Sequence, residues 1–420
     1  MAIVRLALCS LRNRWVTATL TLFAIGFSVA LLLAVEKLRT ETRASFAHTI
    51  SGTDLVVGAR GGSVQLLLYS VFRIGGATHN ISWESYQDIR NHPRIAWTIP
   101  LSLGDSHRGY PVMGTNLDYF RHYRFGREQS LQFEAGGPFN DLFDVVLGAE
   151  VAHRLGYELG DMIVIAHGTG KVAFLEHDDM PFRVAGILKR TGTPVDRTLH
   201  ISLDGMEAIH VDWHGGTPPP PGRRLSPGEV RQVDLTPRSI TAFLVGLDSR
   251  AATFQVQRHV NGYRQEPMLA ILPGVALHEL WSLMGVAEQA LLLVSGAVVA
   301  VGLIGTLAVM LAGLNERRRE MAILRSVGAR PRQIFLLLVS ETLALALAGI
   351  VAGLGMLYLS LHLVQPVVQS RFGIRLAVTA PGWHELALLS LFLAAALLVS
   401  LIPAYRAYRN SLADGLNPRI

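Results

Sequence analysis

The chain of 420 residues has a single cysteine, Cys9, which excludes an internal disulfide and a zinc site built from cysteines. Lysine is nearly missing, with only Lys37, Lys171 and Lys189. Charged residues make up 17% of the chain, where globular proteins average about 25%. Hydrophobic residues supply 50%, and the mean hydropathy is +0.34. These values exclude a disordered, collagen-like or disulfide-rich secreted protein and indicate a membrane protein.

Four stretches are apolar enough to cross a membrane, which takes about 20 residues of helix. They are residues 15–35, 290–314, 334–361 with Glu341 as the one charge, and 386–402, which Pro403 closes. The alternative for each stretch is a buried core helix. The first stretch has a second alternative, a secretory signal peptide, but its apolar run is longer than a signal core and no small-residue cleavage pattern follows. We therefore interpret it as an uncleaved anchor.

Arginine is concentrated in three places: before residue 15, between the second and third stretches, and after Pro403. Residues 315–333 alone carry six arginines against Glu316 and Glu320. Because basic loops stay in the cytoplasm, both termini and residues 315–333 are expected to be cytoplasmic. The sequence pI of about 9.7 then reports topology, and nucleic-acid binding loses its main support.

Residues 36–286 are predicted to form one soluble α+β domain outside the membrane, with helical stalks that continue the first two spans. Strand patterns occupy residues 54–59, 162–166, 182–188, 198–203 and 240–247. Helical patterns occupy residues 82–91, 150–155, 204–210 and 250–263, and the prolines within 215–224 predict an extended loop. The predicted organisation is 1–35 (N-terminus and helix 1), 36–286 (outer domain), 287–314 (helix 2), 315–333 (cytoplasmic loop), 334–361 (helix 3), 362–384 (short outer loop), 385–403 (helix 4) and 404–420 (tail).

The segment from Asn315 to Ile334 has the pattern of a short amphipathic helix, with Gly328 as its C-cap and Pro331 beyond it. On pattern alone, it is also typical of a basic helix held at the inner surface by anionic lipid.

The run Arg319-Glu-Met-Ala-Ile-Leu-Arg-Ser-Val-Gly-Ala329, followed by Ser340-Glu341, resembles the signature of FtsX-like permeases, the membrane subunits of MacB/LolC-type ABC transporters. Residues 146–161 and 182–188 resemble the MacB-like periplasmic core domain. The tail 403–416 resembles the closing pattern of the family, with Leu412 where a proline is common.

This resemblance implies a membrane protein with four transmembrane α-helices and a large α+β periplasmic domain between helices 1 and 2. It implies a bacterial inner-membrane location and a homodimer, or a heterodimer with a second permease. The other implied partners are an ABC ATPase subunit and a periplasmic adaptor or binding protein. ATP and Mg²⁺ would be bound by the ATPase, and this chain would bind no cofactor.

Residues 315–333 would be the coupling helix that docks on the ATPase. Its contact residues would be Arg319, Glu320, Ala322, Ile323, Leu324, Arg325, Ser326, Val327, Gly328, Ala329 and Arg332. Glu341 is a functional candidate as an acid within a span, and its alternative is a structural role such as pairing with a loop arginine.

No phosphate-binding loop is present, because the nearest string, residues 168–172, lacks the first glycine and ends in Val172. We therefore expect no catalytic residue and a separate chain for ATP hydrolysis, unlike MacB proper. Thirteen of the fifteen histidines lie in the outer domain. If residues 210–214 are helical, His210 and His214 share a face and, with Asp212 or His177, make a weak zinc candidate. The alternative is an ordinary polar surface.

Two functions remain after these exclusions. The first is mechanotransmission, in which ATP-driven motion of the permease moves the outer domain to export, extract or transport a substrate. The second is an FtsX-like regulator that activates a periplasmic partner such as a cell-wall hydrolase. The large MacB-like outer domain favours the first.

Overall fold

The computed structural model describes residues 15–168, 175–176, 180–213, 225–372 and 379–409. The predicted loop 215–224 lies wholly outside these residues. The chain divides into two compact units. The membrane unit comprises Met1–Thr42, Gly285–Ser370 and Leu376–Ile420, and the α+β domain comprises Arg43–Met284 with Arg371–Arg375.

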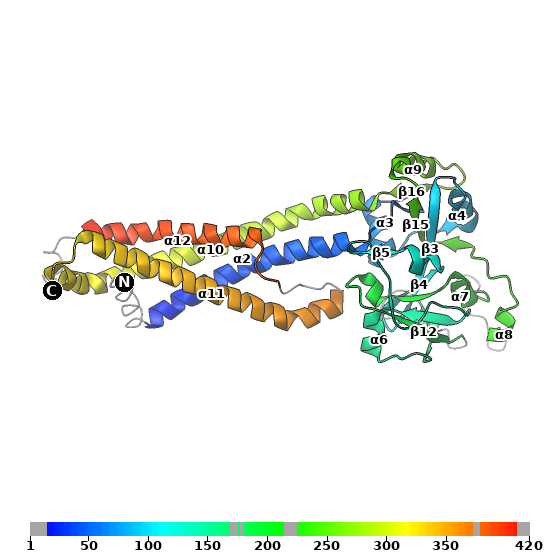
Figure 1. The fold of residues 1–420 in the computed structure, drawn as a ribbon, viewed down its shortest axis with the longest axis horizontal. Helices are drawn as coiled ribbons and strands as arrows, with labels where there is room; N and C mark the ends of the chain where they lie inside the picture. The colour runs from blue at the N-terminus through cyan, green and yellow to red at the C-terminus, as the bar shows by residue number, and fades with distance from the viewer. Residues whose placement is uncertain (1–14, 169–174, 177–179, 214–224, 373–378, 410–420) are drawn as a thin grey trace. The chain divides into compact units, whose positions relative to one another are not determined.

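Four long helices carry the membrane unit: α2 (Trp15–Thr49), α10 (Pro273–Ser326), α11 (Pro331–Phe372) and α12 (Trp383–Arg409) (Figure 1). Each contains a segment long and apolar enough to cross a membrane. These segments fall where the four apolar stretches predict them. A bilayer core supplies no water to backbone groups, so a spanning segment has to satisfy them internally, and a helix does so.

The helix ends differ from the prediction at three places. α10 continues to Ser326, so residues 315–326 are the end of this helix and not a separate short surface helix. α11 runs to Phe372, well into the predicted loop 362–384, and α12 continues through Pro403 to Arg409. Charged residues mark where the chain leaves the hydrocarbon, but they do not end a helix. Pro403 does not end α12 either, because it removes only one backbone hydrogen-bond donor.

Helices α2 and α11 meet at glycines. Gly26 of α2 lies against Gly349 and Gly353 of α11, which have the spacing of a small-residue packing motif. A Cβ atom added at Gly353 would lie 2.7 Å from the Gly26 carbonyl oxygen and 2.9 Å from the Val29 Cβ. The two backbones are therefore close enough that only glycine fits at this contact.

Helix α2 also contacts α10 through Ser28. The Ser28 hydroxyl donates to the Ala24 carbonyl at 2.9 Å and lies 3.4 Å from the Val298 carbonyl oxygen of α10. A Cβ atom at Gly302 would lie 2.5 Å from the Ser28 Oγ. Because both neighbours approach through small residues, α2 is held between α10 and α11.

The α+β domain is built on one mixed sheet in the order β16-β1-β15-β3-β4-β13-β8-β12-β7, with β9, β10 and β11 attached at its sides. The pairs β12–β8 and β13–β4 are parallel. The strands are β1 (Leu55–Ala59), β3 (Ile95–His107), β4 (Tyr110–Thr115), β7 (Phe133–Gly136), β8 (Asp144–Leu147), β9 (Met162–Ile163), β10 (Ala166–His167), β11 (Leu175–Glu176), β12 (Phe182–Leu188), β13 (Leu199–Ser202), β15 (Ala242–Leu247) and β16 (Met268–Ile271), with the short pairs β2 (Ile81–Ser82)–β14 (Ser239–Ile240) and β5 (Arg124–Phe125)–β6 (Gln129–Ser130) beside them.

Strand β3 joins the two halves of this sheet. Its first half pairs with β15, and its second half pairs with β4 and β10. Buried apolar side chains pack on the sheet in three clusters. The covering helices are α3 (Ser63–Ser70), α4 (Trp83–Arg90), α5 (Asp118–His122), α6 (Ala149–Leu155), α7 (Leu203–Ala208), α8 (Pro227–Val230) and α9 (Thr253–Asn261), with the 3₁₀ turns Pro194–Arg197 and Arg250–Ala252.

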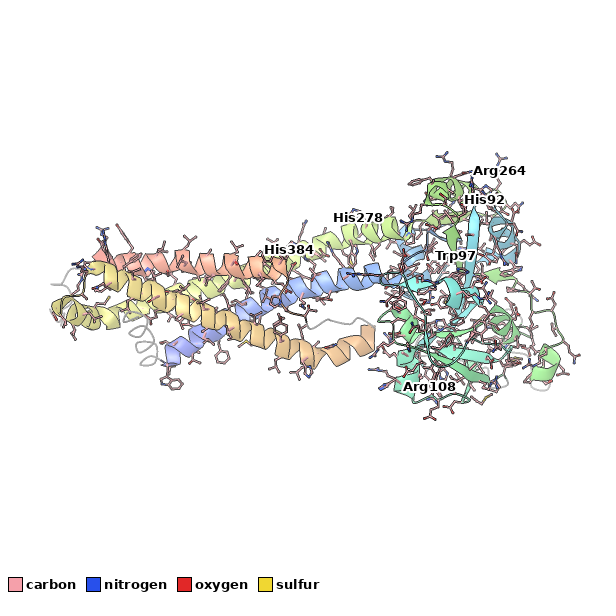
Figure 2. All side chains as sticks on the ribbon, viewed as in Figure 1. His92, Trp97, Arg108, Arg264, His278 and His384 are labelled. Carbon is pink, nitrogen blue, oxygen red and sulfur yellow. The ribbon has the colours of Figure 1, made fainter. Side chains whose placement is uncertain are left out.

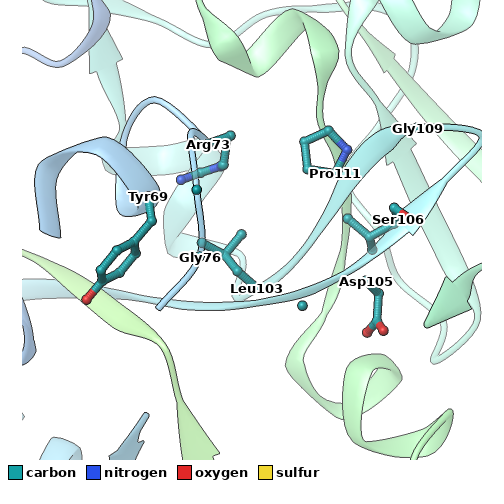
Figure 3. A pocket seen from close by; sticks show the side chains of 11 residues that line it. Tyr69, Arg73, Gly76, Leu103, Asp105, Ser106, Gly109 and Pro111 are labelled. Atoms are coloured by element: carbon teal, nitrogen blue, oxygen red, sulfur yellow. The ribbon is translucent and has the colours of Figure 1, made fainter. Parts of the chain in front are cut away.

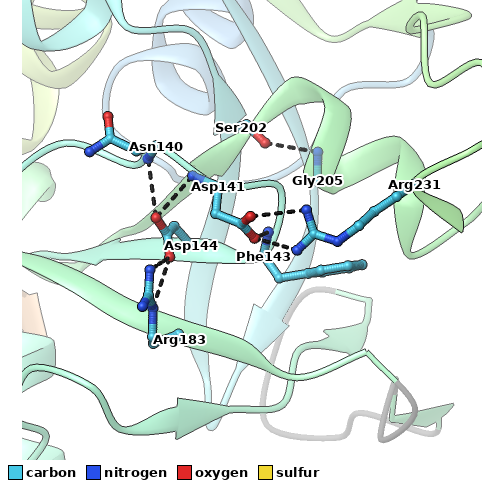
Figure 4. A network of polar contacts seen from close by, with 8 residues as sticks. All are labelled: Asn140, Asp141, Phe143, Asp144, Arg183, Ser202, Gly205 and Arg231. Atoms are coloured by element: carbon cyan, nitrogen blue, oxygen red, sulfur yellow. Dashed lines mark hydrogen bonds and ion pairs between the residues drawn. The ribbon is translucent and has the colours of Figure 1, made fainter. Parts of the chain in front are cut away.

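Ion pairs fix strand β8 to its surroundings (Figure 4). The Asp144 carboxylate accepts from the Arg183 guanidinium of β12 at 2.8 Å and from the backbone N–H of Asn140 and Asp141. Arg231, which follows α8, binds Asp141 through both terminal nitrogens, at 2.9 and 2.6 Å. The buried Asp144 thus sets the position of β8, which lies between β13 and β12 in the sheet.

Most predicted elements of this domain are confirmed, including the strands at β1, β12, β13 and β15 and the helices α4, α6 and α9. The single strand predicted at 162–166 is wrong. It is split into β9 and β10, because the chain changes partners there from β12 to β3. The helix predicted at 204–210 ends at Ala208.

We expect Gly353→Leu to lower the stability of the full-length protein in detergent by about 2 kcal/mol or more, because the side chain cannot enter the α2 contact without displacing backbone. The measurement is thermal unfolding followed by circular dichroism. Gly355→Leu, on the same helix, is the matched control, because a Cβ atom there meets nothing within 4 Å. Equal losses for the two variants would contradict the close contact.

Candidate functional site

The connection between α10 and α11 is a short turn closed by backbone hydrogen bonds. The Ala329 N–H donates to the Leu324 carbonyl at 2.9 Å, and the Gly328 N–H donates to the Arg325 carbonyl at 3.0 Å. Gly328 has a φ of +100°, so the pair of bonds forms a Schellman cap with glycine at its left-handed position. The predicted role of Gly328 as the helix terminator is confirmed.

The next helix begins at once. Pro331 is the first residue of α11, and the Arg330 N–H donates to the Gln333 side-chain oxygen at 2.8 Å. Proline suits a first helical position because it has no N–H to leave unpaired. The turn between the two helices is therefore short and held at both ends.

The residues predicted to dock on an ATPase form two groups in this turn. Val327 is 82% exposed and Ile323 is 53% exposed, and both are apolar. Ser326, Gly328 and Arg332 are exposed, and Leu324, Arg325 and Ala329 are partly exposed. Side chains of Arg319 and Glu320 lie outside the described part of the structure.

The opposite side of the turn is buried. Met321 packs with Ile334 and Leu338 of α11 and with Ala404 and Ala407 of α12, and its neighbour Ala322 is also buried. Ala322 therefore faces the bundle, unlike its predicted neighbours in the docking set. The exposed tip rests on a core shared by three helices.

Glu341 is buried on α11, within the third spanning segment. Its neighbour Thr342 donates to the Leu338 carbonyl at 3.0 Å. The choice between a functional and a structural role for Glu341 stays a prediction.

The histidine candidates are placed differently from the prediction. His210 and Asp212 lie in the turn that follows α7, and residues 210–213 are not α-helical. The backbone hydrogen bonds there join residues three apart in the chain, such as the Trp213 N–H and the His210 carbonyl, and so form a tighter turn than an α-helix. Asp212 accepts from the Leu225 N–H at 3.2 Å. His177 and His214 lie outside the described residues.

His210 instead meets Asp105 and His167. The His167 Nδ1 lies 3.1 Å from the Asp105 Oδ1, and the His210 Nε2 lies 3.5 Å from the same oxygen. Burial raises the pKa of Asp105, but hydrogen bonds from the two histidines outweigh it and hold the pKa at about 2. Burial lowers the pKa of His210, while the hydrogen bond and charge of Asp105 bring it above its ordinary value.

Two family models match the chain. The model described as MacB-like periplasmic core domain matches residues 17–263, and the model described as FtsX-like permease C-terminal matches residues 292–412. The chain belongs to the MacB/FtsX-type ABC transporter permeases. This family is a non-catalytic membrane component of ABC transporters, and the permease is accordingly a bacterial membrane protein.

Solved structures give two further likenesses. The periplasmic region of MacB from Actinobacillus actinomycetemcomitans has 12% identity and a TM-score of 0.32, over 55% of this chain and 94% of that one. The extracellular domain of the ABC-type transporter YknZ from Gram-positive bacteria has 12% identity and a TM-score of 0.31, over 52% and 99%. The comparison with curated proteins found no match.

A polar cluster in the membrane unit of the permease is missed by the sequence analysis. Lys37 of α2 is buried, and its ammonium donates to the Thr379 hydroxyl at 2.8 Å and lies 3.9 Å from the Glu385 carboxylate of α12. Tyr358 of α11 donates to the Thr379 carbonyl at 3.0 Å. The only signal in the sequence is a lysine in a chain that has three.

A pocket of about 440 Å³ in the α+β domain is also missed (Figure 3). Arg73 and Asp105 are the charged members of its lining, and the rest comes mainly from β3, β4 and the glycines at 75 and 76. The Asp105 carboxylate points away from Arg73. No single stretch of sequence predicts this pocket, because its walls come from two separate segments, residues 69–76 and residues 103–112.

We expect Lys37→Met to destabilise the permease in detergent by about 3 kcal/mol, since it leaves the largely buried Glu385 carboxylate without its cation. Thermal unfolding measures the change. Lys189→Met is the control, because Lys189 is exposed in the α+β domain and its loss should cost about 0.5 kcal/mol or less. If Lys37→Met lost as little stability as Lys189→Met, the buried pair would add no stability.

Proposed function

We propose that the permease couples ATP hydrolysis by a separate ATPase subunit to movement of its α+β domain, and so exports, extracts or transports a substrate. The observation that carries the proposal is the α10–α11 turn, where an exposed apolar tip stands on a buried three-helix core. A partner that binds and moves such a tip would move α10, α11 and α12 together, because the three helices share the core beneath it.

The chemistry of the tip suits a protein partner. Ile323 and Val327 offer apolar contacts, and Arg330 and Arg332 are exposed beside them. An apolar centre with basic residues at its edge complements a groove with an acidic rim, and charge complementarity sets the orientation of docking. ATP and Mg²⁺ would be bound in that partner, since the permease sequence has no phosphate-binding loop.

The same proposal fixes the orientation of the chain. The arginine-rich α10–α11 turn and both termini would lie in the cytoplasm, and the α+β domain would lie outside the bacterial inner membrane. The unit in the membrane would be a homodimer, or a heterodimer with a second permease, with a periplasmic adaptor or binding protein as a further partner. The MacB-like match over residues 17–263 supports transport over activation of a cell-wall hydrolase.

We expect Ile323→Asp and Val327→Asp to weaken binding to the ABC ATPase subunit of the transporter by at least about tenfold, because each places a carboxylate in an apolar contact. Binding is measured with purified proteins in detergent. Phe254→Asp, an exposed apolar position on α9, is the matched control and should bind normally. Unchanged affinity in both turn variants would contradict the coupling role.

Cysteine labelling tests the orientation. In a Cys9→Ser background, Phe254→Cys should react with a membrane-impermeant maleimide in cells whose outer membrane is permeable, whereas Val327→Cys should react only after lysis. Both positions are exposed, so burial cannot explain a difference. The reverse pattern would place the α+β domain in the cytoplasm.

A further inference from the structure

Three side chains that can bind a metal converge at one place in the α+β domain: Asp105, His167 and His210. They come from β3, from β10 and from the turn after α7. Their ligand atoms all lie within 4.8 Å of one another. We propose that these residues form a binding site for a divalent transition-metal ion, with Zn²⁺ as the preferred ion. This site shares no residue with the α10–α11 turn, so the metal-site proposal can be tested independently of the proposed coupling role.

The spacing of the ligand atoms fits a zinc ion. The Asp105 Oδ1 lies 3.1 Å from the His167 Nδ1 and 3.5 Å from the His210 Nε2, and the two nitrogens are 3.2 Å apart. In a tetrahedral site with metal–ligand distances of about 2.0–2.1 Å, neighbouring ligand atoms are about 3.3 Å apart. The three atoms thus already form one face of a tetrahedron of this size.

The sheet places two of the ligands. His167 is directly opposite Asp105 in the antiparallel β10–β3 pair. Side chains opposite each other in such a pair lie on the same face and within contact distance. Strand register therefore fixes the positions of Asp105 and His167 relative to each other.

His210 has its second ring nitrogen engaged in the way metal ligands require. Its Nδ1 lies 2.9 Å from the Met206 carbonyl oxygen, which can only accept, so Nδ1 carries a proton. In the neutral ring, the lone pair is then on Nε2, and it is Nε2 that faces Asp105 and His167. A backbone carbonyl that orients the non-ligating nitrogen is typical of zinc-binding histidines.

The surroundings match an exchangeable site with an open position. The Asp105 side chain is 2% exposed, whereas those of His210 and His167 are 27% and 42% exposed. The Trp213 ring is next to the site, with its centroid 5.2 Å from that of the His167 ring. Two imidazoles and one carboxylate select transition metals such as Zn²⁺ over Mg²⁺ and Ca²⁺, which prefer oxygen ligands.

The test is titration of the full-length, untagged permease in detergent with ZnCl₂ after removal of metal by a chelator. We expect one Zn²⁺ ion per chain, with an affinity at least about tenfold lower in Asp105→Asn and in His167→Gln. Zn²⁺ should also raise the thermal midpoint of the parent protein more than that of either variant, because a ligand that binds only the folded state stabilises it. MgCl₂ at the same concentration should leave both readouts unchanged.

His92→Gln is the matched control. His92 and His259 form another histidine pair, with their ring centroids 4.9 Å apart. His92 lies just before the start of β3, whereas Asp105 lies near the end of this strand. Figure 2 labels His92 and also Arg108, which directly follows the last residue of β3. This variant should bind Zn²⁺ like the parent. His167 is partly exposed, so its variant tests the site even if the buried Asp105→Asn fails to fold. No Zn²⁺ binding, or binding that survives His167→Gln, would overturn the proposal, as would equal binding of Mg²⁺.

Discussion

A bilayer offers no water to a backbone N–H or carbonyl, and much of the architecture of this permease follows from that constraint. Each spanning segment has to remain helical across the hydrocarbon, and nothing at the lipid boundary requires the helix to stop. α10 therefore continues for 54 residues, until Gly328 terminates it. The same constraint removes water as a competitor between helices, so association depends on close packing. The contact of Gly26 with Gly349 and Gly353 provides it.

The membrane spans were predictable from sequence, but the helix ends were not. Uncharged runs report contact with lipid, whereas a helix ends where a glycine or proline breaks its hydrogen bonds. For this reason the prediction that Gly328 ends a helix was correct, whereas the prediction of a separate short helix before it was wrong, because α10 continues to Ser326. Lys37 shows a second limit. Its partner Thr379 is 342 residues away in the chain, so only the folded bundle reveals that this lysine is buried.

In the α+β domain, β-branched apolar runs predicted β1, β12, β13 and β15, because these strands are buried on the sheet. Strand β3 was missed, since Pro100, Gly104 and Asp105 interrupt its apolar pattern. The histidine cluster shows the same limit. Sequence spacing favoured His214 as the partner of His210, whereas strand register brings Asp105 and His167 together from positions 62 residues apart. Contacts set by sheet pairing leave no local spacing to recognise.

The cap at Gly328 has a consequence for how such proteins diversify. Its hydrogen bonds join backbone atoms only, so the shape of the cap depends on Gly328 and not on the exposed side chains at neighbouring positions such as 326 and 327. Residues at positions such as 326, 327, 330 and 332 are therefore free to change without cost to the fold. Related permeases in one cell could use this freedom to keep their partners apart, each pair recognising its own surface on a common scaffold.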